Sequence, residues 1–146
     1  MPTPPLIFVL NGPNLNLLGK REPEVYGSDS LDDIAAALSA RAKELGLDLD
    51  IRQSNHEGHL IDWLHEAQER GARAVILNPA GYTHTSVALR DAIAAITVPV
   101  IEVHLSNPQA RESFRRRSLI GGVAKGTISG FGARGYVLAL DAAARL

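Results

Sequence analysis

The sequence predicts an α/β protein with a five-stranded parallel sheet and helices on both faces. Short apolar segments alternate along the chain with amphipathic segments of helical period, which is the order produced by strands joined through crossover helices. Several apolar segments are continuous, as in strands that are buried on both faces of a sheet. The 146 residues, 45% apolar and 21% charged, suit a single domain over residues 1–146 with its own core.

Five strands are expected, and their patterns are of three kinds. The first, third and fourth are apolar runs, although a glutamate interrupts the fourth; the second alternates polar and apolar residues, and the fifth is a short segment bounded by glycines. In chain order, the expected strands are residues 6–10, 47–53, 74–77, 98–103 and 126–130.

Four helices are expected between and after these strands. Ser30 and Asp33 fit a capping box at the start of the first helix. Ser54 and Glu57 repeat that spacing ahead of an apolar stripe, which predicts the second helix. The expected helices are residues 30–45, a segment between residues 54 and 71, residues 85–96 and residues 133–145.

Composition excludes several classes of function. A net charge of −1 provides no basic field for nucleic acid and no polybasic anchor for a membrane surface. The chain has no cysteine, which removes disulfides, thiol nucleophiles and thiolate metal sites. No apolar stretch approaches the length of a transmembrane helix. Residues 1–5 lack the charged and apolar regions of a signal peptide, so a cytoplasmic location is expected.

The chemically unusual residues gather in the loops that leave the strands. In open α/β sheets, ligands bind beyond the carboxyl ends of the strands. The first such loop, residues 11–29, is too long for a simple connection, and its glycines and basic residues predict an active-site lid at about residues 19–27. The alternative is a plain surface loop with two solvated cations and a half-buried tyrosine. The glycine spacing matches neither a dinucleotide fingerprint nor a P-loop.

Two histidines follow strands and are candidates for chemistry. Asn78 directly follows a strand, so its amide is expected to point into the cleft, and His84 lies near a helix N-terminus, which favours its neutral form. A capping or core role is the alternative for His84. Glu102 and His104 are two residues apart in a strand and therefore point to the same side. A buried carboxylate is costly unless paired, and it can fix the tautomer of an imidazole.

Other candidates have plainer alternatives. Metal ligation by His84, Glu102 and His104 is the rival hypothesis for those residues, but no metal-site spacing accompanies them. Asp91 follows His84 by seven residues, roughly 10 Å along a helix, so it either reaches a neighbouring subunit or pairs with a surface cation such as Arg90.

The remaining basic and titratable residues divide into two groups. Residues 111–118 are rich in arginine, and at most one or two of three successive arginines in a helix can face one ligand. Thr83 and Thr85 have a plain interpretation as candidates for the cap of the third helix. The other histidines have no persuasive pattern and are interpreted as structural or surface groups; they are His56, His59 and His65.

These segments together resemble the type II 3-dehydroquinate dehydratases. The resemblance spans nearly the whole chain, in order and with family-like spacing. The matching segments are residues 10–19, 21–23 with 26–27, 53–55 with 57–58, 77–91, 101–107, 111–118 and 126–140.

The resemblance implies a flavodoxin-like three-layer fold and a single catalytic domain. It implies dehydration of 3-dehydroquinate to 3-dehydroshikimate through an enolate, a hydro-lyase step of the shikimate pathway to chorismate and the aromatic amino acids, used also in quinate catabolism. It implies no metal, no Schiff-base lysine and no organic cofactor. The assembly it implies is a homododecamer, a tetramer of trimers.

Roles for the reacting groups also follow from the resemblance. Tyr26 matches the base, and because a free tyrosine has a pKa of about 10, a nearby cation is needed to favour the tyrosinate. Arg21 matches that activating group, although the neighbouring Lys20 is also basic. Asn14 matches the residue that holds the enolate oxygen through an ordered water. His104 matches the general acid.

The remaining matches orient groups or bind substrate. Glu102 matches the partner that orients the acid. Asn78 and the backbone amides of Leu105 and Ser106 match the substrate-carboxylate site. His84 and Arg115 match contacts to the ring hydroxyls, and Asp91 matches a residue supplied by the adjacent subunit.

Two departures from the family pattern are small. Leu105 stands where isoleucine is common, which should not disturb a backbone contact. Arg117 replaces a histidine often found before Ser118, with an open effect on packing. Two other functions remain as alternatives: a non-catalytic flavodoxin-like module that binds a polyhydroxylated acid or a phosphorylated ligand, and a metal-assisted hydrolase.

Overall fold

The five strands form one parallel sheet in the order β2-β1-β3-β4-β5. This computed structural model describes residues 3–146, so Met1 and Pro2 of the N-terminal segment and of the expected domain lie outside the described residues. Both the all-parallel sheet and the presence of each expected strand are confirmed. The strands are β1 (Leu6–Asn11), β2 (Asp48–Gln53), β3 (Ala74–Asn78), β4 (Val100–His104) and β5 (Gly126–Ser129).

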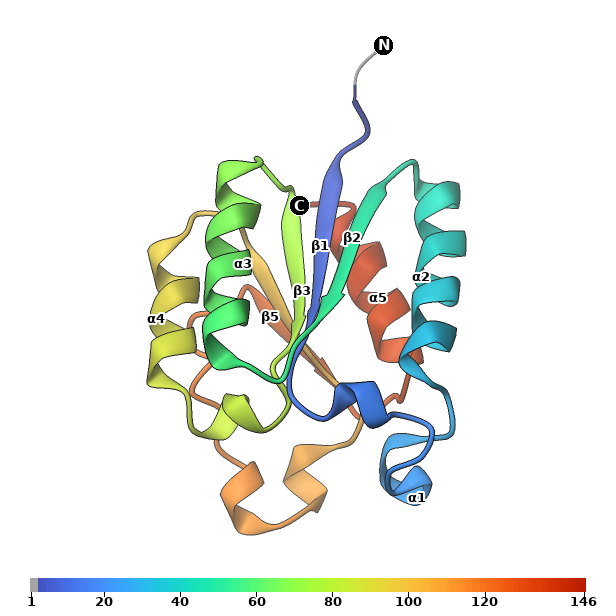
Figure 1. The fold of residues 1–146 in the computed structure, drawn as a ribbon, viewed down its shortest axis with the longest axis vertical. Helices are drawn as coiled ribbons and strands as arrows, with labels where there is room; N and C mark the ends of the chain where they lie inside the picture. Colours follow the sequence, from blue (N-terminus) through green and yellow to red (C-terminus); the bar gives the residue numbers. More distant parts are fainter. Residues whose placement is uncertain (1–2) are drawn as a thin grey trace.

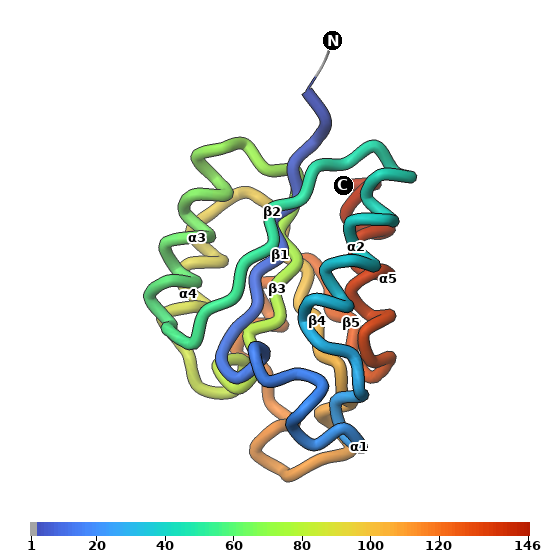
Figure 2. The backbone as a smooth tube through the Cα atoms, turned by 45° about the vertical axis from the view of Figure 1, so that its right-hand side comes forward, coloured from blue at the N-terminus to red at the C-terminus, as the bar shows by residue number. Residues whose placement is uncertain are grey.

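Helices cover both faces of the sheet, as Figures 1 and 2 show. Helices α2 (Leu31–Leu45) and α5 (Arg134–Ala143) lie on one face, and α3 (Glu57–Glu69) and α4 (Val87–Ala95) lie on the other. Apolar side chains fill the two spaces between the layers, and they form two separate clusters of buried residues. The three-layer arrangement confirms the expected fold class.

The end of the sheet to which the strands run carries the short elements (Figure 1). The loops there, which the sequence predicted only as loops, contain brief helical turns. They are α1 (Pro23–Tyr26) and the 3₁₀ turns Leu15–Leu17, Ala80–His84, Pro108–Ala110 and Ser113–Arg115.

Three strands extend one residue beyond their apolar runs and end on a polar side chain. The last residues of β1, β3 and β4 are Asn11, Asn78 and His104. Each still pairs in the sheet, with Asn11 opposite Asn78 and His104 opposite Ser129. Regular backbone therefore fixes these polar residues at the carboxyl edge of the sheet.

The helix starts show which capping predictions hold. The Ser30 hydroxyl accepts from the Asp33 N–H at 3.1 Å, and the Asp33 carboxylate accepts from the Ser30 N–H at 2.9 Å, so the first capping box is confirmed. The prediction for α4 was wrong, because neither threonine caps it. Ser86 does so by accepting from the Leu89 N–H at 2.9 Å.

The capping box predicted at Ser54 and Glu57 was also wrong. Helix α3 begins after His56, and no side chain caps it. The Ser54 hydroxyl instead accepts from the His56 N–H and bonds to the His59 ring. Glu57 accepts a hydrogen bond from Ser86. A tertiary contact to the start of α4 therefore replaces the local reciprocal bond.

Candidate functional site

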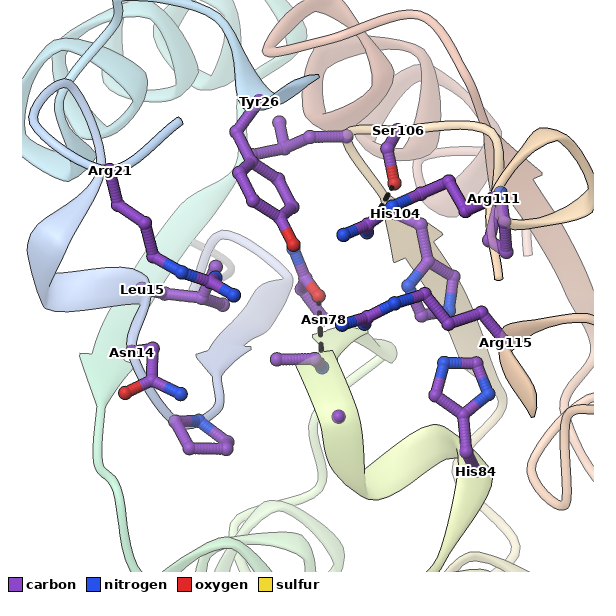
Figure 3. A pocket seen from close by; sticks show the side chains of 15 residues that line it. Asn14, Leu15, Arg21, Tyr26, Asn78, His84, His104, Ser106, Arg111 and Arg115 are labelled. Atoms are coloured by element: carbon purple, nitrogen blue, oxygen red, sulfur yellow. Dashed lines mark hydrogen bonds between the residues drawn. The ribbon is translucent and has the colours of Figure 1, made fainter. Parts of the chain in front are cut away.

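A polar pocket opens at the carboxyl edge of the sheet (Figure 3). Its cavity volume is about 140 Å³. Side chains from the long first loop face side chains from the loops after β3 and β4. The lining residues are Pro13, Asn14, Leu15, Arg21, Tyr26, Asn78, Ala80, Gly81, His84, His104, Leu105, Ser106, Pro108, Arg111 and Arg115.

All the sequence-predicted site residues line this pocket except two. Glu102 is fully buried and lies behind His104, to which it is bonded. Asp91 is exposed and pairs with Arg90 at 2.9 Å, so within one chain it adopts the plainer role considered for it. The three histidines interpreted as structural or surface groups are exposed and lie outside the pocket; they are His56, His59 and His65.

Tyr26 projects into the pocket between two arginines (Figure 3). The Arg21 guanidinium carbon lies 4.7 Å from the centre of the Tyr26 ring, and that of Arg111 lies 5.0 Å from it. Lys20 is exposed and does not line the pocket. Of the two basic residues at positions 20 and 21, the arginine is therefore the one placed to act on the tyrosine.

Glu102 and His104 form a close buried pair at the end of β4. The Nε2 atom of His104 lies 2.6 Å from Glu102 Oε2. Burial raises the pKa of the Glu102 carboxyl, but the hydrogen bond and charge of His104 oppose burial, as do hydrogen bonds from Thr83 and Ser118. The result is a pKa below the usual value for glutamate. The carboxylate therefore stays ionised beside the ring and commits Nε2, which leaves Nδ1 for a ligand.

Three hydroxyls contact the Glu102 carboxylate in addition to the imidazole, and the most distant, that of Thr127, donates to Oε1 at 3.5 Å. Thr83 donates to Oε2 at 2.8 Å, and Ser118 lies 3.1 Å from both carboxylate oxygens. Thr83 is buried at the turn after β3. Burying a charge in an apolar strand is unfavourable unless the charged group is fully hydrogen-bonded. These contacts supply the hydrogen bonds that the Glu102 carboxylate needs.

His84 and Arg115 lie together on the opposite wall from Arg21 (Figure 3). The Nδ1 atom of His84 lies 2.7 Å from the Arg117 carbonyl oxygen. Because a carbonyl can only accept, Nδ1 carries a proton and donates it to this bond, and Nε2 is the other ring nitrogen. The Arg115 Nε donates to both oxygens of Glu112 at 3.1 and 3.2 Å. The family departure at Arg117 therefore leaves its backbone contact to His84 intact.

The floor of the pocket is made where the first loop touches the loop that follows β3. The Gly12 N–H donates to the Asn78 carbonyl at 2.8 Å. A Cβ atom at Gly12 would lie 2.7 Å from the Pro79 carbonyl oxygen, so only glycine allows this approach. Asn78 lines the pocket, but its side chain is largely committed, with Oδ1 accepting from the Ala80 N–H and Nδ2 donating to Tyr136.

Arg111 is the main pocket residue to which the sequence assigned no role. It belongs to the basic stretch, but spacing could not show which arginine faces inward because the stretch folds into short turns instead of a continuous helix. Among the three successive arginines at 115–117, only Arg115 lines the pocket, which fits the expected number, although the stretch is not the helix on which that expectation was based. The Arg111 guanidinium also donates to the Ser106 hydroxyl at 3.2 Å.

Residues 3–146 contain no group of three or more histidine and acidic side chains arranged to hold a metal ion. No helix within the same range is long and apolar enough to cross a membrane.

The fold and pocket define an α/β protein with a cationic ligand site at the carboxyl ends of parallel strands, equipped with an acid–base pair. Comparisons with known proteins identify the family. The model of the class II dehydroquinases matches residues 5–144. The 3-dehydroquinate dehydratase of Sinorhizobium medicae is 62% identical over 136 residues, 93% of this chain and 91% of that protein. That of Phenylobacterium zucineum is 59% identical over 140 residues, 96% of each chain.

Solved structures agree. The type II dehydroquinase of Butyrivibrio crossotus superposes with a TM-score of 0.95 at 40% identity, covering 97% of this chain and 99% of that one. The enzyme of Propionibacterium acnes gives 0.93 at 44% identity, covering 100% and 99%. The chain therefore belongs to the class II dehydroquinase family, a family of hydro-lyases, and its fold is flavodoxin-like.

Proposed function

We propose that the pocket lined by Tyr26 and His104 is where this class II dehydroquinase removes water from 3-dehydroquinate to form 3-dehydroshikimate. One observation carries the assignment. A tyrosine flanked by two guanidinium groups and a histidine braced by a buried carboxylate line the same small cavity. A base and an acid are the two groups that elimination of water from a hydroxy ketone requires.

The first step is removal of a proton beside the ketone. Tyr26 is the base, and Arg21 and Arg111, whose guanidinium carbons lie 4.7 and 5.0 Å from the centre of its ring, place positive charge beside the reacting atoms. The C–H bonding electrons pass to the carbonyl oxygen and give an enolate. Asn14, which lines the pocket on the same loop, stabilises the developing oxyanion through a bound water.

The second step is loss of the hydroxyl β to the ketone. The enolate electrons form the new carbon–carbon double bond as the carbon–oxygen bond breaks. His104 donates the proton that converts the departing hydroxide into water, because hydroxide is a poor leaving group. Glu102 holds the ring through Nε2, so the proton leaves from Nδ1. Before the transfer, the Glu102 carboxylate stabilises the positive charge of the imidazolium.

The remaining lining residues recognise the substrate. Asn78 and the backbone amides of Leu105 and Ser106 bind its carboxylate, while His84 and Arg115 contact the ring hydroxyls. All line the pocket. The surplus of cationic side chains in a chain of net charge −1 supports a small anionic ligand.

Residues 19–27 act as a lid that brings Tyr26 to the substrate. The segment is bounded by Gly19 and Gly27, whose φ angles are +88° and +85°, conformations suited to glycine hinges. Closure would exclude water and place the Tyr26 hydroxyl beside the substrate.

The assembly and location remain predictions from the resemblance. A homododecamer built as a tetramer of trimers would let Asp91 of one subunit reach the pocket of its neighbour, since within its own chain it lies outside the pocket. Sedimentation and native mass spectrometry test the assembly. A cytoplasmic location is expected for an enzyme of the shikimate pathway.

The proposed chemistry is tested with protein treated with a chelator. Conversion of 3-dehydroquinate gives a conjugated enone, seen as rising ultraviolet absorbance. Tyr26→Phe is expected to keep its circular dichroism spectrum and lose nearly all turnover, because it keeps the ring and removes the base. Near-normal turnover by that variant would contradict the base assignment, and restoration of treated protein by a divalent metal would support a metal-assisted reaction instead.

A further inference from the structure

A chain of buried hydrogen bonds runs beneath the pocket, and its central member is Tyr136 of α5. The Tyr136 hydroxyl donates to Asn11 Oδ1 at 2.6 Å and accepts from Asn78 Nδ2 at 2.9 Å. All three side chains are 3% exposed or less. Neither Tyr136 nor Asn11 takes part in any chemical step proposed above.

Backbone groups at the two ends fix the direction of every bond in this chain. The Ala80 N–H can only donate, so the atom of Asn78 that lies 3.1 Å from it is oxygen and the amide nitrogen faces Tyr136. At the other end, the Arg52 carbonyl can only accept. It therefore binds Asn11 Nδ2, at 3.1 Å, and turns Asn11 Oδ1 toward the phenol.

The consequence for Asn78 is a single amide orientation. An asparagine amide has two N–H donors, and one of them is held by Tyr136. The other is left for a ligand in the pocket that Asn78 lines. Burial raises the pKa of the Tyr136 hydroxyl well above its usual range, so the phenol keeps its proton at neutral pH and donates it to Asn11.

We propose that Tyr136 is a positioning residue, which fixes the Asn78 amide for recognition of the substrate carboxylate. The inference rests on the proposed role of Asn78 in binding that carboxylate. Without the hydroxyl, Asn78 Nδ2 loses its buried acceptor, and the amide is held from one side only, by Ala80. The aromatic ring can remain in place, because its packing in the core does not depend on the hydroxyl.

The test compares Tyr136→Phe, Asn78→Ala and the double variant with 3-dehydroquinate as substrate. Tyr136→Phe is expected to raise KM about tenfold while kcat changes less than about threefold, since the carboxylate is bound alike before and during reaction. Because Tyr136 acts through Asn78, the double variant should have a KM within about twofold of Asn78→Ala alone.

A core substitution on the same helix provides the control. Leu140→Ala, one turn after Tyr136 and also fully buried, is expected to lower the thermal midpoint and leave KM within about twofold of the natural protein. If Tyr136→Phe does not fold, Asn11→Ala serves instead, because it removes the acceptor that orients the phenol. Asn11→Ala should again raise KM, and the double variant with Asn78→Ala should have a KM close to that of Asn78→Ala alone.

The outcomes separate the inference from the function beneath it. Additive effects in the double variant, or an unchanged KM in Tyr136→Phe beside a raised KM in Asn78→Ala, overturn the positioning role alone. An unchanged KM in Asn78→Ala overturns the carboxylate assignment and the inference with it. Absence of turnover by the natural protein overturns the proposed function itself.

Discussion

The histidines of this protein differ in chemical role because their surroundings differ. His104 is nearly buried and bonded to a carboxylate that lies 2.6 Å away, whereas His56 is exposed and contacts the ring of His59. Only the first has a fixed tautomer facing a cavity. Histidine chemistry at this site therefore depends on the strand that carries Glu102 and His104 as neighbours on one side.

Substituting each histidine measures this difference. His104→Ala is expected to lower kcat by about 10²- to 10⁴-fold, the usual contribution of a general acid. His56→Ala should leave kcat and KM within about twofold, since surface changes have small effects. Steady-state assays of both variants check the prediction, and equal losses would undermine the distinction between the two histidines.

The place of Arg111 beside the Tyr26 ring predicts a contribution to catalysis that is separate from that of Arg21. Arg111→Met keeps most of the side-chain length and removes the charge 5.0 Å from the Tyr26 ring. We expect kcat to fall about 10- to 100-fold, equal to ~1.4–2.7 kcal/mol of transition-state stabilisation. Arg116→Met, an exposed arginine outside this pocket, is the matched control. A kcat unchanged in Arg111→Met would assign activation to Arg21 alone.

Among individual residues, the sequence predicted those whose role follows from their spacing within one strand or helix. The pairing of Glu102 with His104 follows from strand alternation, and the structure confirms it. Arg111 could not be assigned in the same way. Its direction depends on two 3₁₀ turns that bring residues 111 and 115 back over the pocket, and no periodic pattern marks such turns.

The elements that build the pocket are short and irregular, while the elements that support it are regular. The first loop contacts the loop after β3 through Gly12, and it then passes over the sheet edge through the 3₁₀ turn Leu15–Leu17 and α1. Gly27 follows Tyr26 with φ +85° and ψ 174°, a region that is essentially restricted to glycine. Movement of this segment about its ends is therefore sensitive to any added Cβ.

Substitution at this hinge is expected to affect turnover more than folding. Gly27→Ala meets no neighbouring atom, so its cost of about 1–3 kcal/mol is backbone strain alone, which should displace Tyr26 and lower kcat. Gly46→Ala is the control, because Gly46 also has a positive φ and open space but ends α2, far from the pocket in the sequence. Thermal unfolding and steady-state kinetics are measured on both variants. A lowered thermal midpoint with unchanged kcat in Gly27→Ala would mean that residues 19–27 are merely a surface loop.

Element prediction succeeded where the signal was local and failed where a distant residue competed. Strands and helices appear in the expected order, and Ser30 caps α2. The failures at α3 and α4 share one cause. Ser86 caps α4 and also donates to Glu57, so the acidic residue of the expected box is engaged by another helix.

At the scale of the whole molecule, buried and paired carboxylates link stability to pH. The Arg52 hydrogen bond to Asp50 outweighs burial and lowers the pKa of that carboxyl. Glu102 also has a pKa below its usual value because its hydrogen-bond partners outweigh burial. Groups with a lowered folded pKa add stability that is complete above the unfolded value and is lost as pH falls through the folded one.

The thermal midpoint is therefore expected to be nearly constant above about pH 6 and to fall between about pH 5 and 3, where such carboxylates take up protons. Glu102→Gln should be less stable than the natural protein at pH 7, yet show a shallower decline in acid, because one of the linked groups is gone. Calorimetry across this range measures both slopes. Parallel slopes would mean that Glu102 contributes nothing to the acid dependence.

The overall architecture was the most predictable level, because it depends on period and order. Alternating strand and helix patterns are sufficient for a parallel sheet, and the crossovers follow. The order β2-β1-β3-β4-β5 was not predicted, since no local pattern states which strands are neighbours. The role of Asp91 also does not follow from a local pattern, because its proposed partner is another subunit.

The hydrogen bonds that join Asn11, Asn78 and Tyr136 also bear on synthesis of the chain. They tie the first strand to the last helix, so a nascent polypeptide still held by the ribosome short of α5 lacks the phenol that links the two asparagines. Such a chain can pair β1 with β2 and β3, but its pocket floor stays incomplete. The catalytic cavity is thus expected to mature only after α5 has left the ribosome, and products that stop before α5 would be inactive even where their sheet has formed.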